Sequence, residues 1–536
     1  TKNINKFIPF INNLNGYFAF AILDTQNHQI FLVRDRYGQK PLFYGIYNSD
    51  FCFGSTITDV KNYLGISVNV NKVEFDSRKI NDSDLFIATR GINLDGHDFI
   101  SSSIQSGANS IILECLPDDI VEGICYVEVE NSSNALSIIA SNYYDNPSSK
   151  LKLIGVTGTN GKTTVATLLH QLFMKLGYLA GLLSTIENKI GNVSLKSTHT
   201  TGDALQINKM LNDMIESGCE YCFMEVSSHA IHQKRVENLK FDGGIFTNIT
   251  HEHLDYHKNL KEYILVKKKF FDDLDASAFA ITNKDDKNGG IMLLNTKAKK
   301  VTYSLKSIAD YRCKILESRL DGMLLNIHNI QLWVRIIGEF NAYNLLAIYS
   351  AAVELGLDSS KVLTSISLLT PAEGRFHTVR SLDNITGIVD YMHTPDAYEN
   401  VLHTINNIRT SNEKLIMVFG CGGDRDSEKR SKMTNIACNF SDQVIITADN
   451  PRTEDLNSIV KDMLSEIDPI KRKKILIIHD RSQAIKTACA LAQSGDIILL
   501  AGKGHEKYQE INGEKYPFDD VKELVESLNI STENVI

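Results

Sequence analysis

The ten residues at positions 155–164, Gly-Val-Thr-Gly-Thr-Asn-Gly-Lys-Thr-Thr, point most directly to chemistry. They follow an apolar run at 151–156 that is typical of a buried strand, and they precede residues 165–176, whose apolar positions recur at helical spacing. Glycines let backbone N–H groups close around phosphate oxygens, the helix N-terminus favours negative charge, Lys162 neutralises more of it, and a Thr hydroxyl suits Mg2+. This order predicts a nucleoside triphosphate site. The alternative is a structural turn, because the usual pattern has glycine where this chain has Val156.

Polar motifs also follow two apolar strands that are predicted farther along the chain. The strand at 221–226 ends in Glu225-Val226-Ser227-Ser228-His229-Ala230, and the strand at 243–246 ends in Thr-Asn-Ile-Thr at 247–250. Ligands of open α/β sheets lie at the carboxyl ends of the strands, so we expect both motifs to face the phosphate loop. Glu225 would then suit Mg2+, which prefers carboxylate oxygen. Its alternative role is to cap a helix.

The next motif is rich in histidine. His251, His253 and His257 precede a predicted helix that carries three consecutive lysines at 267–269. Their spacing differs from the H-E-x-x-H register of helical zinc sites. We therefore expect one histidine on a metal and the others in hydrogen bonds, whereas three lysines in a row are typical of a solvated helix face.

The composition indicates a globular protein with several domains. A chain of 536 residues exceeds what one core usually holds, so three or four domains are expected. The net charge of −9 does not indicate a nucleic-acid partner. No stretch reaches the roughly 18 uncharged apolar residues of a membrane helix, and no signal-like apolar region is found at the N-terminus, so no membrane partner is expected. The nine scattered cysteines favour reduced thiols in the cytoplasm, and Cys219 and Cys222 are interpreted as core residues.

Residues 1–66 differ from the rest of the chain. Strands are predicted at 17–23 and 29–33, and a turn and third strand follow at 34–44. The sequences NGYFAF at 15–20 and RDRYGQKPLFY at 34–44 resemble part of the glutamine amidotransferase domain of asparagine synthetases. That family attacks glutamine with an N-terminal cysteine, whereas this chain begins with Thr1. The resemblance therefore implies a truncated, inactive amidotransferase-like fragment.

Strands and helices alternate over the remaining chain. Residues 67–148 carry short predicted strands at 84–88, 108–114 and 124–129, with helices at 97–106 and 133–144. Residues 372–536 carry five buried strands separated by helices, which predicts a doubly wound parallel sheet. Polar motifs at four strand ends together predict a ligand at one edge of that sheet. They are DYMHTP at 390–395, residues 420–430, which include GGDRD, DNPR at 449–452 and GKGHE at 502–506.

Taken in chain order, these motifs resemble those of the Mur ligase family over essentially all of residues 67–536. Members of that family use the glycine spacing of 155–164, so the resemblance accounts for Val156. It implies an α/β, three-domain Mur ligase preceded by the β-rich fragment of residues 1–66. The three domains are an α/β UDP-binding domain (67–148), a P-loop ATPase central domain (149–371) and a Rossmann-like C-terminal domain (372–536). The matching sequences are TGTNGKTT, EVSSHA, HLDYH, GEFNAYN, DYMHTPD, GCGGDRD, DNPR and GKGHE.

The resemblance also implies a set of site residues, with ATP and Mg2+ as cofactors. Lys162, Glu225, His253 and a carbamylated Lys267 would be catalytic, and Thr163, Glu225, His253 and Lys267 would bind metal. Carbamylation turns the lysine into an anion, which explains a lysine otherwise assigned to solvent. ATP is expected on Gly158, Thr159, Asn160, Gly161, Lys162, Thr163, Thr164, Asn341, Asn344, Arg375 and Asp390, although the two asparagines would equally cap a helix at 345–355. UDP-MurNAc-L-Ala-D-Glu is expected on Ser77, Asp95, Gly96, His97, Thr200, Thr201, Ser227, Gln233 and Arg235.

The amino acid that the resemblance implies is meso-diaminopimelate. The DNPR form resembles members that add this amino acid, whose distal carboxylate can pair with the Arg452 guanidinium. The expected contacts are Arg425, Asp449, Asn450, Pro451, Arg452, Gly502 and Glu506. The implied reaction, in peptidoglycan precursor synthesis, is ATP-dependent amide formation through an acyl phosphate on D-Glu, carried out by a cytoplasmic monomer. The alternatives are a lysine-adding ligase, a folylpolyglutamate or cyanophycin type of ligase, and a degenerate nucleotide-binding fusion protein.

Overall fold

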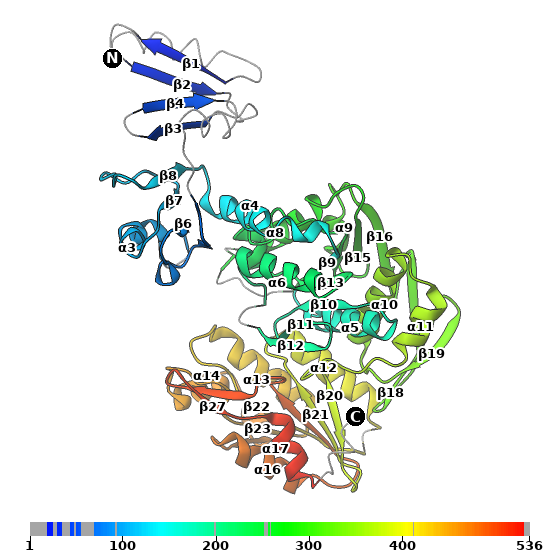
Figure 1. Cartoon of the computed structure of the whole chain (residues 1–536). Coiled ribbons are helices and arrows are strands. Elements are labelled where there is room, and N and C mark those ends of the chain that lie inside the picture. The colour runs from blue at the N-terminus through cyan, green and yellow to red at the C-terminus, as the bar shows by residue number, and fades with distance from the viewer. Residues whose placement is uncertain are drawn as a thin grey trace. The chain divides into compact units, whose positions relative to one another are not determined.

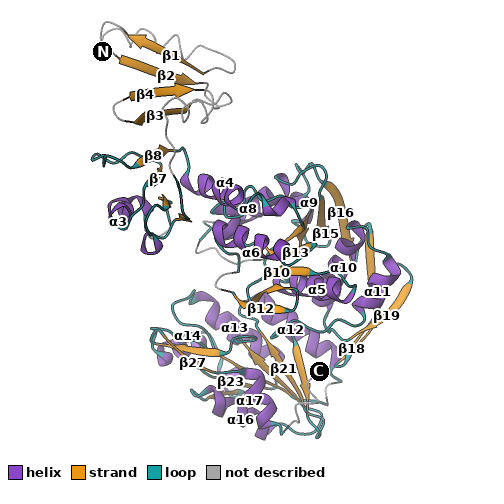
Figure 2. Cartoon of the chain, in the orientation of Figure 1, coloured by secondary structure: helices purple, strands orange, loops and turns teal. Residues whose placement is uncertain are grey.

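A computed structural model describes the chain at residues 19–24, 29–34, 43–47, 50–54, 69–91, 94–197, 200–250, 256–257, 259–410 and 412–529. The chain divides into two compact units, Thr1–Leu136 and Ser137–Ile536. Each unit combines helices and strands, so the predicted α/β class is confirmed (Figures 1 and 2). Among the described residues, no helix has the length and apolar character that crossing a membrane requires.

The first unit contains two antiparallel hairpins and a parallel sheet. The hairpins are β1 (Ala19–Asp24) with β2 (Gln29–Arg34) and β3 (Phe43–Tyr47) with β4 (Asp50–Gly54). Strands β1 and β2 lie close to the predicted ones, whereas β3 overlaps the segment predicted at 34–44 only at its first two residues and β4 was not predicted. The parallel sheet has the order β5-β6-β7-β8, and Ile111 and Leu113 of β7 are buried in its core with Phe86 of β6. Its strands and helices are β5 (Val73–Glu74), η1 (Ser77–Lys79), β6 (Leu85–Ile87), η2 (Gly96–Phe99), α3 (Ile100–Gln105), β7 (Ser110–Leu113), β8 (Cys125–Glu128) and the beginning of α4 (Ser132–Tyr143).

The second unit begins with a large mixed sheet around strand β9 (Lys152–Thr157). The order of its described strands is β12-β11-β10-β13-β9-β14-β15-β16-β17-β18-β19, and the strands from β10 to β17 run parallel. Strand β9 thus lies between β13 (Tyr221–Glu225) and β14 (Gly243–Phe246), which carry the two predicted polar motifs. The other strands are β10 (Ala180–Leu183), β11 (Glu187–Ile190), β12 (Val193–Lys196), β15 (Phe279–Asn283), β16 (Lys299–Ser304), β17 (Tyr311–Arg319), β18 (Gly322–Ile327) and β19 (Ile330–Val334).

Helices cover both faces of this sheet. Ile154 and Val156 of β9 pack in one apolar core with α5 (Lys162–Lys175) and α10 (Glu339–Glu354). Leu153 lies in a second core with α6 (Ala204–Glu216) and α8 (Leu260–Asp272). Because successive strand side chains point to opposite faces, the continuous apolar sequence of β9 requires both layers. The remaining helices of this region are η3 (Pro147–Ser149), α7 (Ser228–His232), α9 (Gly289–Met292) and α11 (Ser359–Ile366).

The C-terminal sheet is doubly wound, as predicted. Its order is β20-β21-β25-β22-β23-β24, and only the edge strand β20 runs antiparallel to its neighbour among the described strands. Helices α12–α14 cover one face and α16 and α17 cover the other. The strands are β20 (His377–Arg380), β21 (Thr386–Asp390), β22 (Leu415–Phe419), β23 (Gln443–Ile446), β24 (Ile475–Ile477) and β25 (Ile497–Ala501), followed by the hairpin β26 (Tyr508–Ile511) and β27 (Glu514–Pro517). The helices are α12 (Pro395–Ile408), α13 (Glu428–Phe440), α14 (Leu456–Leu464), α15 (Pro469–Arg472), α16 (Arg481–Leu491) and α17 (Asp520–Ser527).

A fully buried ion pair joins the two helices on the second face of this sheet. Arg481, the first residue of α16, donates from Nε and Nη2 to Asp520, the first residue of α17, at 2.7 and 2.6 Å, and both side chains are 0% exposed. The same guanidinium group donates to the carbonyl oxygens of Ala448 and Ala501, at 3.4 and 3.0 Å. Arg481 therefore ties both helices to the carboxyl-end side of β23 and β25.

We expect Arg481→Met to lower the free energy of unfolding of the C-terminal domain by about 3–5 kcal/mol, because it leaves the Asp520 carboxylate buried without its counter-charge. Urea unfolding followed by circular dichroism would measure the change. Adding Asp520→Leu should recover most of the loss, whereas Lys522→Met, which breaks an exposed pair on α17, should change stability little. A double variant as unstable as Arg481→Met would contradict this account.

Candidate active site

The loop between β9 and α5 has the geometry of a phosphate cradle. Gly158 and Gly161 adopt φ angles of 152° and 86°, which L side chains rarely adopt. A Cβ atom on Gly158 would lie 1.9 Å from Thr247 Oγ1, and one on Gly161 would lie 2.7 Å from Asn344 Oδ1. Both positions require glycine, and the loop leads into the N-terminus of α5, whose first N–H groups have no partner within the helix.

Side chains around the loop hold it in place. The motif after β14 contacts it as predicted, because Thr247 Oγ1 donates to Asn160 O at 2.6 Å and Asn248 Oδ1 accepts from Asn160 N at 2.9 Å. The Lys162 ammonium group donates to the carbonyl oxygens of Gly158 and Thr159, at 2.9 and 2.7 Å. Its positive charge is therefore held directly over the loop.

Strand β13 places Glu225 beside this loop, opposite Val156 in the register. The side chain is 0% exposed. Its Oε1 accepts from Thr185 N at 2.7 Å, but its Oε2 has no hydrogen-bond partner among the described residues. Glu225 caps no helix in the described contacts, because the N-cap of α7 is Ser227, whose Oγ accepts from Ala230 N. A buried carboxylate oxygen without a partner is costly, so a divalent cation fits this position.

Lys267 lies against the same loop, and the expectation of a solvated lysine face is wrong for it. The side chain is 1% exposed. Its Nζ donates to Gly158 O at 2.9 Å and to Thr157 Oγ1 at 3.3 Å, and it lies 4.8 Å from the centre of the Tyr263 ring. Lys268 is also buried and pairs with Asp272, whereas Lys269 is accessible. Helix α8 therefore directs one of three consecutive lysines at the phosphate loop.

The histidine motif is only partly described, because His251 and His253 lie outside the described residues. His257 is buried, and its Nε2 has no partner among the described residues. Burial and the nearby His229 and His232 lower the pKa of His257 to about 4, so its ring is neutral at physiological pH. Within the described ranges, no cluster of three His, Cys, Asp or Glu residues is placed to bind a metal.

The residues predicted for the rest of ATP meet at the border of the C-terminal domain. Arg375 Nη2 donates to Thr163 Oγ1 at 3.4 Å, and its guanidinium group lies 4.8 Å from the Tyr391 ring centre. Asn160 Nδ2 donates to Asp396 Oδ2 at 2.9 Å. Both contacts join this domain to the phosphate loop. Thr164 is buried in α5, and Asp390 is buried at the end of β21, where burial raises the pKa of its carboxyl group.

The asparagine pair at the start of α10 uses its amide groups within the protein. Asn341 Nδ2 donates to Ile337 O at 2.7 Å, and Asn344 Nδ2 donates to Asn341 Oδ1 at 3.0 Å. Both residues are buried. These contacts favour a bracing role beside Gly161, and an adenine contact for the pair stays a prediction.

Four residues predicted for the UDP-MurNAc-dipeptide lie together in the second unit. Arg235 Nη1 donates to Thr201 O at 3.0 Å, and its Nη2 donates to Gln233 Oε1. Thr201 Oγ1 accepts from Ser227 N at 3.1 Å and donates to Glu225 O at 2.8 Å. This cluster is thus bonded to the strand end that carries the unpartnered carboxylate. Thr200 is half-buried next to it in sequence.

In the first unit, Asp95 caps the N-terminus of η2, and Gly96 and His97 are the first two residues of that helix. Glu114 N donates to His97 Nε2 at 2.8 Å, so Nδ1 carries the ring proton and donates it to Asp95 Oδ1 at 2.6 Å. Hydrogen bonds from His97, the backbone N–H above all, keep the pKa of Asp95 below its usual value. A Cβ on Gly96 would lie 2.6 Å from Thr89 O. Ser77 is half-buried at the start of η1.

The four polar motifs of the C-terminal sheet meet at one edge, as the sequence predicts. Gly423 N donates to Asn450 O at 2.9 Å, and Arg452 Nη1 donates to Gly423 O at 2.7 Å. A Cβ on Gly502 would lie 2.7 Å from Asp449 Oδ2, and the His505 and Tyr391 rings lie 4.7 Å apart. Asn450 Nδ2 donates to Glu506 Oε2 at 2.8 Å. Pro451 is buried in the same loop, whereas Arg425 is exposed.

Two buried cations at this edge were missed by the sequence analysis. Lys503 lies within the GKGHE motif, where the sequence predicts no role for it, and its Nζ donates to Asn450 Oδ1 at 3.0 Å. Arg430 of α13 donates to both carboxylate oxygens of Glu454 at 2.6 Å and to Gly422 O at 3.1 Å. Arg430 therefore joins the loops after β22 and β23. Residues Glu428–Phe440 are largely polar and show little helical apolar pattern, so the sequence does not place Arg430 on the buried face of a helix.

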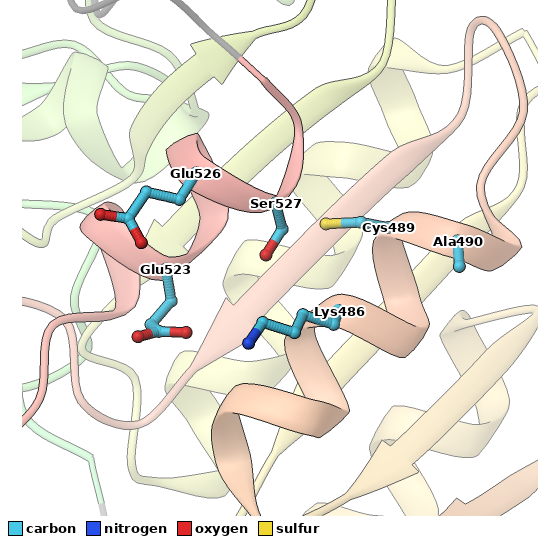
Figure 3. A pocket seen from close by; sticks show the side chains of 6 residues that line it. All are labelled: Lys486, Cys489, Ala490, Glu523, Glu526 and Ser527. Atoms are coloured by element: carbon cyan, nitrogen blue, oxygen red, sulfur yellow. The ribbon is translucent and has the colours of Figure 1, made fainter.

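A surface hollow lies elsewhere in this domain. It has a volume of about 280 Å3 and is lined by residues of α16 and α17 (Figure 3). None of the predicted site residues lines it. Its lining residues are Lys486, Cys489, Ala490, Glu523, Glu526 and Ser527.

Comparison with known families covers nearly the whole chain. Residues 69–144 match the Mur ligase family catalytic domain, residues 156–352 the Mur ligase middle domain, and residues 374–504 the Mur ligase glutamate ligase domain. Residues 8–83 match a glutamine amidotransferase domain, in agreement with the motifs at 15–20 and 34–44.

Individual relatives agree with these matches. A UDP-N-acetylmuramoyl-L-alanyl-D-glutamate--2,6-diaminopimelate ligase of Cytophaga hutchinsonii is 53% identical over 465 residues, covering 86% of this chain and 96% of the relative. The protein of that name from Bacteroides fragilis is 48% identical over 477 residues, covering 89% and 98%. A solved structure with that name is 32% identical, with a TM-score of 0.63, and covers 88% of this chain and 98% of that one. The chain therefore belongs to the Mur ligase family.

Proposed function

We propose that the protein is an ATP-dependent ligase that joins meso-diaminopimelate to UDP-MurNAc-L-Ala-D-Glu in peptidoglycan precursor synthesis. The observation that carries this proposal is the pair of opposite charges beside the DNPR loop. Asn450 contacts the Glu506 carboxylate, and the adjacent Arg452 has a half-buried guanidinium group whose Nε lies 3.6 Å from Glu510 Oε2. The distal end of meso-diaminopimelate carries one ammonium and one carboxylate group, which complement these two side chains. The names of the relatives support the same substrates.

The phosphate loop supplies the first half of the reaction. The D-Glu carboxylate attacks the γ-phosphate of ATP, ADP leaves and an acyl phosphate forms, while the Lys162 ammonium group over the loop stabilises the charge on the transferring phosphoryl group. The free amine of diaminopimelate then displaces phosphate and forms the amide bond. The cluster of Thr201, Ser227, Gln233 and Arg235 would hold the D-Glu end beside the loop.

Mg2+ is the metal that we propose for the loop. Glu225, through its unpartnered Oε2, and Thr163, through its hydroxyl group, would hold it, with His253 as a further ligand. Bound there, the ion would neutralise phosphate charge. The buried carboxylate is the observation that supports this proposal. All nine cysteines are free, which supports the proposed cytoplasmic location.

We further propose that Lys267 is carbamylated in the active enzyme. Its Nζ already lies within hydrogen-bond distance of Gly158 O and Thr157 Oγ1 at the loop. Carbamylation would replace a buried ammonium group by an anion beside the proposed metal. A neutral or positively charged side chain at position 267 would not provide this attraction for the proposed metal.

The proposed function predicts release of ADP from ATP only when both UDP-MurNAc-L-Ala-D-Glu and an amino acid are present. Offered separately, meso-diaminopimelate should support turnover and L-lysine should support far less, because lysine lacks the carboxylate for Arg452. A coupled ADP assay with mass analysis of the product would measure both. No turnover with either amino acid would refute the ligase proposal, and a preference for lysine would refute the role of Arg452 alone.

Lys267→Ala should abolish turnover, and added bicarbonate should not restore it, because no amine remains to be carbamylated. Lys269→Ala is the matched control on the same helix, since its exposed pair with Asp273 lies away from the loop. Steady-state rates of both variants, measured with and without bicarbonate, would test this expectation. Normal activity in Lys267→Ala would exclude the carbamate role.

Glu225→Gln should raise the Mg2+ concentration needed for half-maximal activity by about tenfold or more, because an amide oxygen carries no charge for the cation. Thermal unfolding would check that the buried site stays folded. An unchanged Mg2+ requirement would place the metal on other residues.

A further inference from the structure

A lysine lies at the centre of the residues assigned to the amino acid. Lys503 is completely buried. Its Nζ donates to Asn450 Oδ1 at 3.0 Å and to Glu506 Oε2 at 3.4 Å, and it lies 3.6 Å from Asp449 Oδ1. All three partners belong to the predicted amino-acid site, yet no step of the proposed reaction uses Lys503 itself.

The charges in this cluster do not cancel. The largely buried side chains of Asp449 and Glu506 carry two negative charges, and the Lys503 ammonium group between them carries one positive charge. One negative charge is therefore left for a ligand. Without Lys503, the two carboxylates would face each other with no positive charge between them, which raises the energy of the ionised pair.

Lys503 also fixes the orientation of the Asn450 side-chain amide. Asn450 Oδ1 accepts from Lys503 Nζ and from Glu510 N, the latter at 2.9 Å. Its Nδ2 is consequently turned toward Glu506 Oε2, at 2.8 Å. A flipped amide would place an NH2 group against the ammonium group and the Glu510 N–H, leaving three donors without an acceptor.

We propose that Lys503 is a positioning residue of the amino-acid pocket: its ammonium group neutralises one of the Asp449 and Glu506 carboxylates and fixes the Asn450 amide, so that a single negative charge receives the distal ammonium group of the incoming amino acid. This inference rests on the proposed function and assigns the charge balance that the pocket needs. Lys503 acts through Asn450 and Glu506 and does not touch the reacting atoms.

The charge balance bears on selectivity. A substrate with a zwitterionic distal end brings its own carboxylate to Arg452, close to this cluster. Removing Lys503 adds an uncompensated negative charge, which repels that carboxylate but not an ammonium group. The loss of Lys503 should therefore weaken the binding of meso-diaminopimelate more than the binding of L-lysine.

The pKa of Glu506 depends on the charge of Lys503. Burial is the main cause that raises the pKa of Glu506, the nearby Asp449 raises it further, and Lys503 lowers it. Other titratable groups also face the cluster. Tyr391 and Tyr508 lie beside it, with Arg375 against Tyr391, and Asp449 also interacts with Arg481, Tyr398 and Cys421. In Lys503→Met the pKa of Glu506 rises, so its carboxylate is lost at a higher pH as the solution is acidified.

The first test compares Lys503→Met with the wild-type enzyme in steady-state kinetics. We expect the KM for meso-diaminopimelate to rise about tenfold, as for loss of a charged hydrogen bond, with little change in the KM for ATP. The acid limb of the pH profile of that KM should move to higher pH. Lys503→Arg, which keeps the charge, should retain the wild-type profile, whereas Lys503→Gln, which keeps a donor without charge, should behave like Lys503→Met.

Lys515→Met is the matched control, because Lys515 lies on the Tyr508 ring at 4.0 Å but is exposed. It should leave both KM and profile unchanged. The proposal would be overturned if Lys503→Met left the pH profile unshifted, or if it raised the KM for ATP as much as the KM for the amino acid. A wild-type enzyme that turns over only L-lysine would refute the proposed substrate and leave the pH test applicable to that amino acid.

A second measurement does not depend on turnover. If Lys503 is the counter-ion, Lys503→Met should be destabilised most at neutral and alkaline pH, and the deficit should shrink as the pH falls and Glu506 becomes protonated. Thermal unfolding of both proteins over a pH series would show this. A deficit that is independent of pH would mean that Lys503 only fills space, even in a protein without ligase activity.

Discussion

The close approach of the phosphate loop to its neighbours is the constraint on which the rest of the second unit depends. Gly158 lies so near Thr247 that no side chain fits there, and Lys267 donates to the same backbone. Three elements therefore meet at one turn: the end of β9, the loop after β14 and helix α8. Parallel strands bring their carboxyl ends to one edge, so this geometry follows from the order of strands in the sheet.

Buried charge is the second theme, and it is handled in two ways. In the C-terminal domain, Arg481 and Asp520 satisfy each other, and the pair joins helices to strand ends. At Glu225 and in the Lys503 cluster the balance is incomplete, with one carboxylate oxygen lacking a described partner and one negative charge in excess. A buried ion pair whose charges cancel connects parts of the fold. A buried carboxylate whose charge is not balanced within the protein favours the binding of a cationic ligand.

The sequence predicted much of this protein, because its strands are apolar on both faces and end in motifs of unusual composition. Strands β14 and β22 have the predicted bounds, and the doubly wound order of the last domain follows from alternating strands and helices. The family followed from eight motifs in order. What periodicity could not supply was the direction of single side chains on α8, where Lys267 is buried and Lys269 is not.

Other features depend on contacts between distant segments. The buried positions of Lys503 and Arg430 arise from packing between the loops after β22, β23 and β25. Helix α13 is rich in polar residues and shows little helical apolar pattern, so Arg430 was not recognised. The site assignments for the substrates came from resemblance alone, and they stay predictions that the geometry is compatible with.

The contacts between the phosphate loop and the C-terminal domain have a thermodynamic consequence. Asn160 of the loop donates to Asp396, and Arg375 donates to Thr163 in the first turn of α5, so both the loop and the start of its helix contact the C-terminal domain. Any ligand that takes over these loop groups changes the free energy with which the domains associate. By linkage, the association of the domains changes the affinity of the loop for that ligand by the same factor. Domain arrangement and nucleotide affinity are thus one coupled equilibrium in this chain.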